Sequence, residues 1–229
     1  MRSLLTSACL LLASLPDVLA ANSTGCDNYD QNKPYRLVFT WHQLGSSAQS
    51  IVNGEDIKNN GVLPYYGVKA IANSSAIFVV PDGINNGWAN QGGEDVTYGG
   101  AMSYALACAR PDMISGIAVI SGGLLSGCSG GTTPVAFYGQ HGTRDSVLNV
   151  GMGRQLRGKF VTTNGCTRLA SEPQPNVGNA VKSVYTGCKQ GHPVTWVIHD
   201  DYHDPSQVNQ SSTNPFAPGY TWEFFTQST

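Results

Sequence analysis

Charged residues are scarce in this sequence, and no basic cluster stands out. Only 12% of the 229 residues are Asp, Glu, Lys or Arg, and the formal net charge is −2. Because nucleic-acid-binding domains carry a basic patch, we do not expect a nucleic-acid partner. No two cysteines have the C-x-x-C spacing typical of zinc and redox sites, so we expect no metal and no organic cofactor.

Long hydrophobic runs are also absent, except at the N-terminus. Residues 1–20 read as a secretory signal peptide: Arg2 supplies a positive charge, 4–16 is apolar but too short to span a bilayer, and Ala20 is a small residue suited to cleavage. We therefore expect a secreted, extracellular protein with no membrane association. Residues 21–229 suffice for one domain with a full core, which we expect to be a monomer.

The cysteine count is odd once Cys9 leaves with the signal peptide. Five cysteines remain: Cys26, Cys108, Cys128, Cys166 and Cys188. In an oxidising compartment at least one of these thiols lacks a partner within the chain. The same compartment permits glycans at three Asn-x-Ser/Thr sites, which begin at Asn22, Asn73 and Asn209.

Short apolar runs alternate with helix-like segments along the chain. The runs predict strands at 35–41, 76–80, 117–121, 134–138 and 194–198, and helices are expected at 47–58, 63–72, 100–110, 150–162 and 220–226. Near-continuous apolar strands between helices are typical of a parallel sheet covered on both faces. The sequence therefore predicts an α/β fold with a mostly parallel sheet.

A hydrolase nucleophile turn is present only in part. Such a turn, G-x-S-x-G, joins a strand to a helix and exposes a serine hydroxyl. Thr97 stands where the serine belongs, and Asp95 where the first glycine belongs. No strand is predicted between Val80 and the helix at Gly100, and a missing helix and strand with their loops would amount to roughly 25–40 residues.

Two residues that could carry chemistry follow buried strands. Asp145 comes after the strand at 134–138, and His203 comes after the strand at 194–198. The carboxyl ends of parallel strands are where α/β proteins place their sites, and nucleophile, acid, histidine is the α/β-hydrolase order. A metal cluster of His199 and His203 with nearby aspartates is an alternative interpretation. His192 precedes its strand and is expected to be structural.

The loop after the first strand resembles an oxyanion loop. Hydrolases place backbone N–H donors there and at the residue after the nucleophile, so the oxyanion and substrate set comprises Trp41, His42, Gln43, Leu44 and Tyr98. An ordinary strand-ending turn is the alternative. Trp41, Trp88 and Tyr202 are candidates to stack on a phenolic ring, although such aromatics also serve in packing.

Several segments together resemble the secreted fungal feruloyl esterases of the C type, which are related to polyhydroxybutyrate depolymerases. The resemblance covers nearly the whole chain after the signal peptide and is carried by 35–45, 80–83, 88–90, 98–104, 138–142, 191–196, 203–207 and 217–225. It implies an α/β-hydrolase that cleaves ferulate esters on arabinoxylan and pectin, with Asp145 as the triad acid and His203 as the base. The family's nucleophile serine, in a Gly-Phe-Ser-Tyr-Gly-Gly turn, matches Thr97.

The same resemblance implies an internal deletion around Val96-Thr97. The family carries a helix, a cysteine and a strand before its serine, and this chain lacks all three. The lost cysteine would make the count even, and the lost strand would be central, so its removal would expose two sheet edges. We interpret the deletion as a mispredicted intron or a skipped exon. Alternatives are a catalytically inactive hydrolase fold that binds a polysaccharide or a partner, and an esterase for acetylxylan or polyester.

Overall fold

The computed structural model describes residues 29–55, 62–83, 87–89, 95–96, 99–125, 133–205, 208–209 and 212–227. The predicted signal peptide lies outside these residues. None of the described helices combines the length and the apolar surface that a bilayer span requires.

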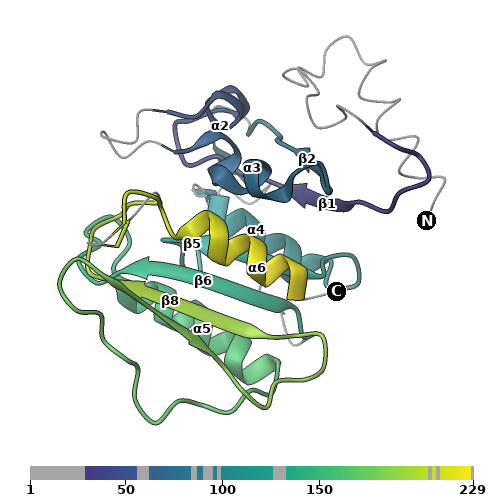
Figure 1. Ribbon diagram of the computed structural model, residues 1–229. Coiled ribbons are helices and arrows are strands. Elements are labelled where there is room, and N and C mark those ends of the chain that lie inside the picture. Colours follow the sequence, from purple (N-terminus) through teal and green to yellow (C-terminus); the bar gives the residue numbers. More distant parts are fainter. Residues whose placement is uncertain are drawn as a thin grey trace.

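A four-stranded sheet forms the larger part of the fold (Figure 1). Its order is β5 (Gly116–Ile120), β6 (Ala136–Gly142), β8 (Val194–His199) and β7 (Ala180–Val184). The first two pairs are parallel and β7 is antiparallel to β8. Every residue of β6 and β8 is buried, as expected for strands covered on both faces.

Helices cover both faces of this sheet. On one face Leu156 and Phe160 of α5 (Val150–Thr163) join the core cluster that contains Phe137. On the other face Phe224 of α6 (Ala217–Gln227) packs with Tyr138. The predicted α/β fold is therefore confirmed.

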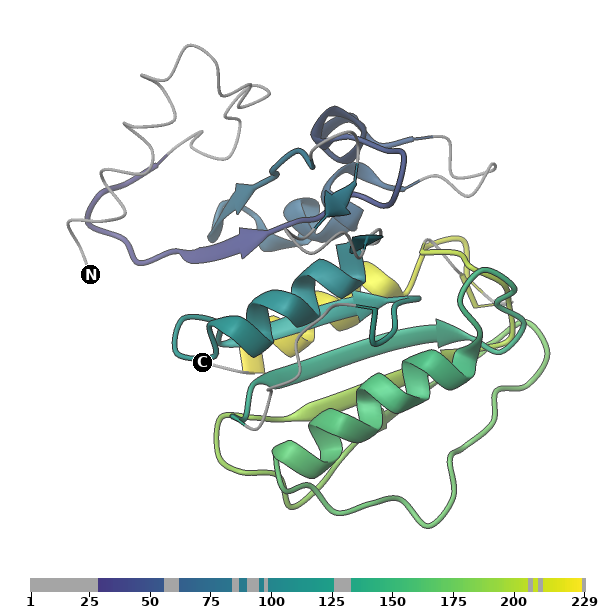
Figure 2. The same cartoon turned by 180° about the vertical axis from the view of Figure 1, so that it is seen from behind.

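A second, two-stranded sheet stands apart from the first. β1 (Arg36–Phe39) and β2 (Ala76–Val79) are parallel, and α2 (Ala48–Asn53), the 3-10 helix η3 (Pro64–Gly67) and α3 (Val68–Ala72) connect them. In Figures 1 and 2 helices α4 (Gly99–Ala109) and α6 lie between this pair and the strands β6 and β8. A small antiparallel ladder joins β3 (Trp88–Ala89) to β4 (Asp95–Val96).

Several strands have an unpaired edge within the described part of the chain, among them β1, β2, β5 and β7. β1 pairs only with β2, and β5 pairs only with β6. On β1, Leu37 and Phe39 are 45% and 43% exposed, which is unusual for apolar residues of a parallel strand. The loss of a central strand stays a prediction.

Several predicted elements differ in extent. The helix expected at 47–58 ends at Asn53, because Gly54 has φ +76° and lies against Pro64. The helix expected at 63–72 is divided into η3 and α3. The strand β7 was not predicted, and the short strands β3 and β4 form between Val80 and Gly100, where no strand was predicted.

Disulfide bonding includes every cysteine that the structure describes. Cys166 pairs with Cys188, and Cys108 is also disulfide-bonded. Cys26 and Cys128 lie outside the described residues, so the odd thiol stays a prediction. The Cys166–Cys188 bond ties the end of α5 to the turn before β8 and closes a loop of 22 residues.

Replacing both Cys166 and Cys188 by serine should lower the free energy of unfolding by about 3 kcal/mol, because opening a loop of this length restores chain entropy to the unfolded state. Urea unfolding would measure the change. Each single replacement should cost about as much as the double one, since either opens the bond. A double variant as stable as the parent would contradict the stabilising role.

Candidate active site

The structure brings Asp145 and His203 together. Each lies in a loop after a neighbouring parallel strand, and the register pairs Gly142 at the end of β6 with His199 at the end of β8. His203 Nδ1 lies 2.8 Å from Asp145 Oδ2. Because a carboxylate oxygen only accepts, Nδ1 carries the proton and donates it, which leaves Nε2 free to act as a base.

The Asp145 carboxylate is held in one orientation. Its side chain is fully buried, and Oδ1 accepts hydrogen bonds of 2.9 Å from the backbone N–H groups of Val147 and Leu148. By contrast, 29% of the His203 side chain is exposed. A buried, oriented acid beside a partly exposed imidazole is the geometry that general-base catalysis requires.

Two further histidines lie near this pair. His141 Nε2 is 3.2 Å from Asp145 Oδ2, the same oxygen that His203 contacts. His199 is fully buried, neither of its ring nitrogens has a hydrogen-bond partner among the described residues, and burial lowers its pKa to about 4. Sequence reasoning did not assign His141, although its i, i+4 spacing from Asp145 was a usable signal.

The alternative of a metal cluster has no geometric support in the described residues. Within them, no three histidine, cysteine or carboxylate side chains lie close enough together to hold an ion. Asp200 and Asp201 instead face Arg144, whose Nε lies 3.3 Å from Asp200 Oδ1. The Arg144 guanidinium also lies 4.8 Å from the ring centre of Tyr202, which is 54% exposed beside His203.

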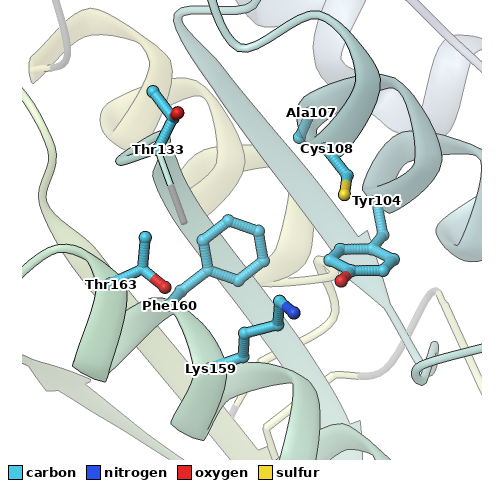
Figure 3. Close-up of a pocket in the computed structure, with 7 residues that line it drawn as sticks. All are labelled: Tyr104, Ala107, Cys108, Thr133, Lys159, Phe160 and Thr163. Atoms are coloured by element: carbon cyan, nitrogen blue, oxygen red, sulfur yellow. The ribbon is translucent and has the colours of Figure 1, made fainter. Parts of the chain in front are cut away.

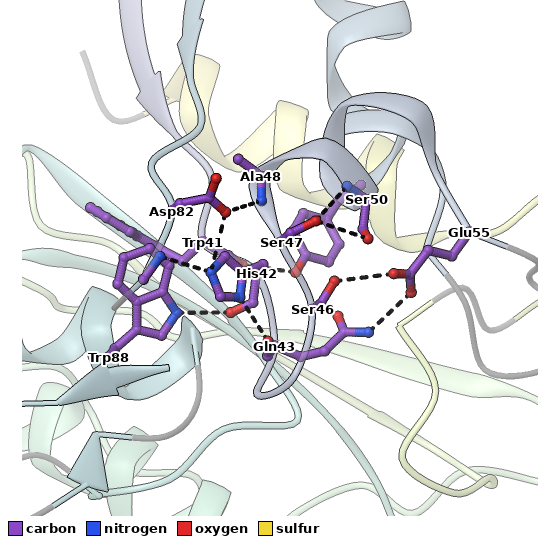
Figure 4. A network of polar contacts seen from close by, with 12 residues as sticks. Trp41, His42, Gln43, Ser46, Ser47, Ala48, Ser50, Glu55, Asp82 and Trp88 are labelled. Atoms are coloured by element: carbon purple, nitrogen blue, oxygen red, sulfur yellow. Dashed lines mark hydrogen bonds and ion pairs between the residues drawn. The ribbon is translucent and has the colours of Figure 1, made fainter. Parts of the chain in front are cut away.

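The predicted oxyanion loop is held by a polar network (Figure 4). His42 is fully buried: its Nε2 accepts the N–H of Gly83 at 3.0 Å, and its Nδ1 donates to the Gln43 carbonyl at 2.8 Å. The Trp88 indole donates to the His42 carbonyl at 2.9 Å. The His42 side chain therefore braces the loop and has no free nitrogen for a ligand.

The other members of this loop differ in exposure. Trp41 is partly buried and meets Trp88 edge to face, with ring centres 5.1 Å apart. Gln43 donates to Glu55, and Leu44 is 48% exposed. Their oxyanion and substrate roles stay predictions.

Helix α4 begins between this loop and the loop after β5. A Cβ added at Gly99 would lie 2.6 Å from the Trp41 carbonyl oxygen, and one added at Gly100 would lie 3.3 Å from Gly122 Cα. Both glycines are therefore needed for the close approach. Thr97 and Tyr98, which precede the helix, lie outside the described residues.

The predicted glycosylation sites are placed unequally. Asn73 is exposed at the end of α3. Asn209 is partly buried, and its side-chain oxygen accepts the N–H of Ala180 at 2.9 Å. Asn22 lies outside the described residues. His192, expected to be structural, lies before β8, at the other end of the strand from His203.

A small hollow between α4 and α5 lies apart from the acid–histidine pair (Figure 3). It contains neither Asp145 nor His203, and its lining consists of Tyr104, Ala107, Cys108, Thr133, Lys159, Phe160 and Thr163. The chemistry therefore concentrates at the carboxyl ends of β6 and β8. The α/β fold, with an aspartate and a histidine there in this chain order, fits the class of α/β-hydrolases.

Comparison with known proteins identifies the family within that class. No family model matches, but the chain is 46% identical to feruloyl esterase D of Neurospora crassa over 98% of its own length and 97% of the relative. It is 36% identical to feruloyl esterase C of Emericella nidulans, with 98% of each chain covered, and 38% identical to a probable feruloyl esterase C of Aspergillus terreus. The chain belongs to the fungal feruloyl esterase family of the C type.

The alignments are longer than the chain itself. The alignment with the Neurospora protein spans 281 positions, whereas the chain has 229 residues, so at least 52 positions of the relative have no counterpart here. This difference exceeds the roughly 25–40 residues estimated for a missing helix and strand.

The buried His199 should make stability depend on pH. Its pKa of about 4 in the folded state lies below the ordinary value of 6.5, so the unfolded state binds more protons between these limits. The free energy of unfolding should therefore fall by about 3 kcal/mol as the pH drops from about 6.5 to about 4.

Urea unfolding at several pH values would measure this dependence in the parent protein and in H199Q. The H199Q variant should lose the part of the decline that the His199 imidazole contributes, whereas the part due to His141, whose pKa burial also lowers, should remain. The matched control H192Q changes the histidine that precedes β8 and should keep the decline. An unchanged pH dependence in H199Q would contradict the assignment.

Proposed function

We propose that the chain is a secreted carboxylic ester hydrolase of the feruloyl esterase type, and that its substrates are ferulate esters on plant cell-wall polysaccharides such as arabinoxylan and pectin. The observation that carries the proposal is the 2.8 Å contact between His203 Nδ1 and the buried Asp145 carboxylate. The relatives named feruloyl esterase, aligned over nearly the whole chain, support the same activity.

In this mechanism His203 acts as the base and later as the acid. Its Nε2 takes the proton of the nucleophile hydroxyl and returns it to the leaving alcohol, while Asp145 fixes the tautomer and stabilises the imidazolium. Backbone N–H groups of the Trp41–Leu44 loop and of Tyr98 would bind the oxyanion. No cofactor is needed for any of these steps.

The mechanism needs a nucleophile hydroxyl, and in this chain Thr97 stands at the position that matches the family's serine. We infer that an internal deletion at Val96-Thr97 removed the family's serine together with the strand before it. Three observations support the inference. At least 52 positions of the Neurospora relative have no counterpart in this chain, the cysteine count is odd, and β1 and β5 each have an unpaired edge within the described residues. Thr97 would be a poor replacement for the serine, because its additional methyl group would crowd the strained turn of the family.

Hydrolysis of methyl ferulate by the purified, mass-verified 229-residue protein tests the proposal. We expect a rate at least about 10³-fold below that of the Neurospora relative, because loss of the nucleophile leaves only the residual catalysis of the remaining site. A rate within tenfold of the relative would contradict the loss of the nucleophile. Retention on insoluble arabinoxylan without any hydrolysis would favour the alternative of a binding protein.

A further inference from the structure

Asp145 is contacted by two histidines, and the proposed mechanism uses only one of them. His203 Nδ1 and His141 Nε2 lie 2.8 Å and 3.2 Å from the same oxygen, Asp145 Oδ2. His203 reaches the surface, whereas the His141 side chain is 1% exposed. A histidine buried against the acid of a catalytic pair needs an explanation, because its ring carries polar atoms that burial penalises.

The surroundings of His141 decide which nitrogen carries its proton. Nε2 lies 2.7 Å from the Leu148 carbonyl oxygen as well as 3.2 Å from Asp145 Oδ2, and both of these groups are acceptors. Nε2 must therefore bear the proton and donate it. Burial lowers the pKa of His141, which keeps the ring neutral and in this form.

The backbone of Leu148 links the His141 ring to the Asp145 carboxylate. The carbonyl of Leu148 accepts the hydrogen bond from His141 Nε2–H, and the N–H of Leu148 donates to Asp145 Oδ1 at 2.9 Å. His141 thus fixes the turn that fixes Asp145, and its N–H dipole also faces the second carboxylate oxygen. Loss of this donor would leave the buried Leu148 carbonyl without its side-chain partner.

The rest of the fold holds the His141 ring in place. Gly153 of α5 packs against it, and a Cβ added there would overlap His141 Nδ1. On the same face of the sheet the Trp196 ring stacks at 6.3 Å between ring centres. The donor therefore has one position, which a positioning role requires.

We propose that His141 is a positioning residue for the acid–histidine pair: its Nε2–H, held between the Leu148 carbonyl and Asp145 Oδ2, orients the carboxylate toward His203. The proposal rests on the proposed role of Asp145 and His203, but its test does not need turnover. A histidine that merely filled space would leave the Asp145–His203 hydrogen bond unchanged when another polar side chain took its place.

The test is the low-field proton NMR signal of His203 Nδ1–H in the 229-residue protein, assigned by its loss in D145N. H141Q places an amide N–H near the position of Nε2, and we expect it to retain the signal. H141N carries the same amide one methylene shorter, too short to reach, and should shift or lose it. H192Q is the control histidine at the other end of β8 and should leave the signal unchanged.

Retention of the signal at its original position in H141N would overturn the proposal, and so would equal perturbation by H141Q and H141N. If H141N does not fold, H141M, which fills the space without any N–H donor, takes its place and should shift or lose the signal; an unchanged signal in folded H141M would overturn the proposal. Failure of the esterase assay would leave this readout intact, so the two proposals fail separately.

Discussion

Pairing between parallel strands is the constraint on which the rest of this structure depends. Within the described part of the chain, β1 pairs only with β2 and β5 pairs only with β6, so the two sheets are not hydrogen-bonded to each other. Helix contacts bridge the two sheets instead, among them the packing of α3 against α6 and the glycine start of α4 between Trp41 and Gly122. The exposure of Leu37 and Phe39 follows from this division.

The acid–histidine pair lies on the four-stranded sheet, after its neighbouring strands β6 and β8. β6 and β8 are fully buried neighbours, so the loops that carry Asp145 and His203 leave the sheet side by side. Backbone N–H groups and two histidines then fix one carboxylate. The chain can therefore keep the geometry of the proposed acid–histidine pair without the segment whose loss we propose.

The sequence predicted the residues that follow buried strands, but it did not predict the residues and the strand whose places are set by tertiary packing. Asp145 and His203 were predictable because each follows a continuous apolar run. His141 was not assigned although it lies four residues before Asp145, and His199 was considered only as a metal ligand, since the sequence of a buried strand does not show which groups its histidines pack against. The strand β7 was missed because Lys182 and Ser183 interrupt its apolar pattern, and the segment before it is held by Glu172 against Arg154 of α5, a tertiary contact.

We propose that Val96 and Thr97 flank an internal deletion, at the place where the family has a helix, a cysteine, a strand and the nucleophile serine. Sequencing the messenger RNA of the source organism across the codons for Asp95 to Tyr98 tests it most directly. If a segment has been lost here, the messenger should contain additional in-frame codons, including a serine codon before those for Tyr98-Gly99-Gly100. A messenger that joins these codons directly, with no longer form, would contradict it.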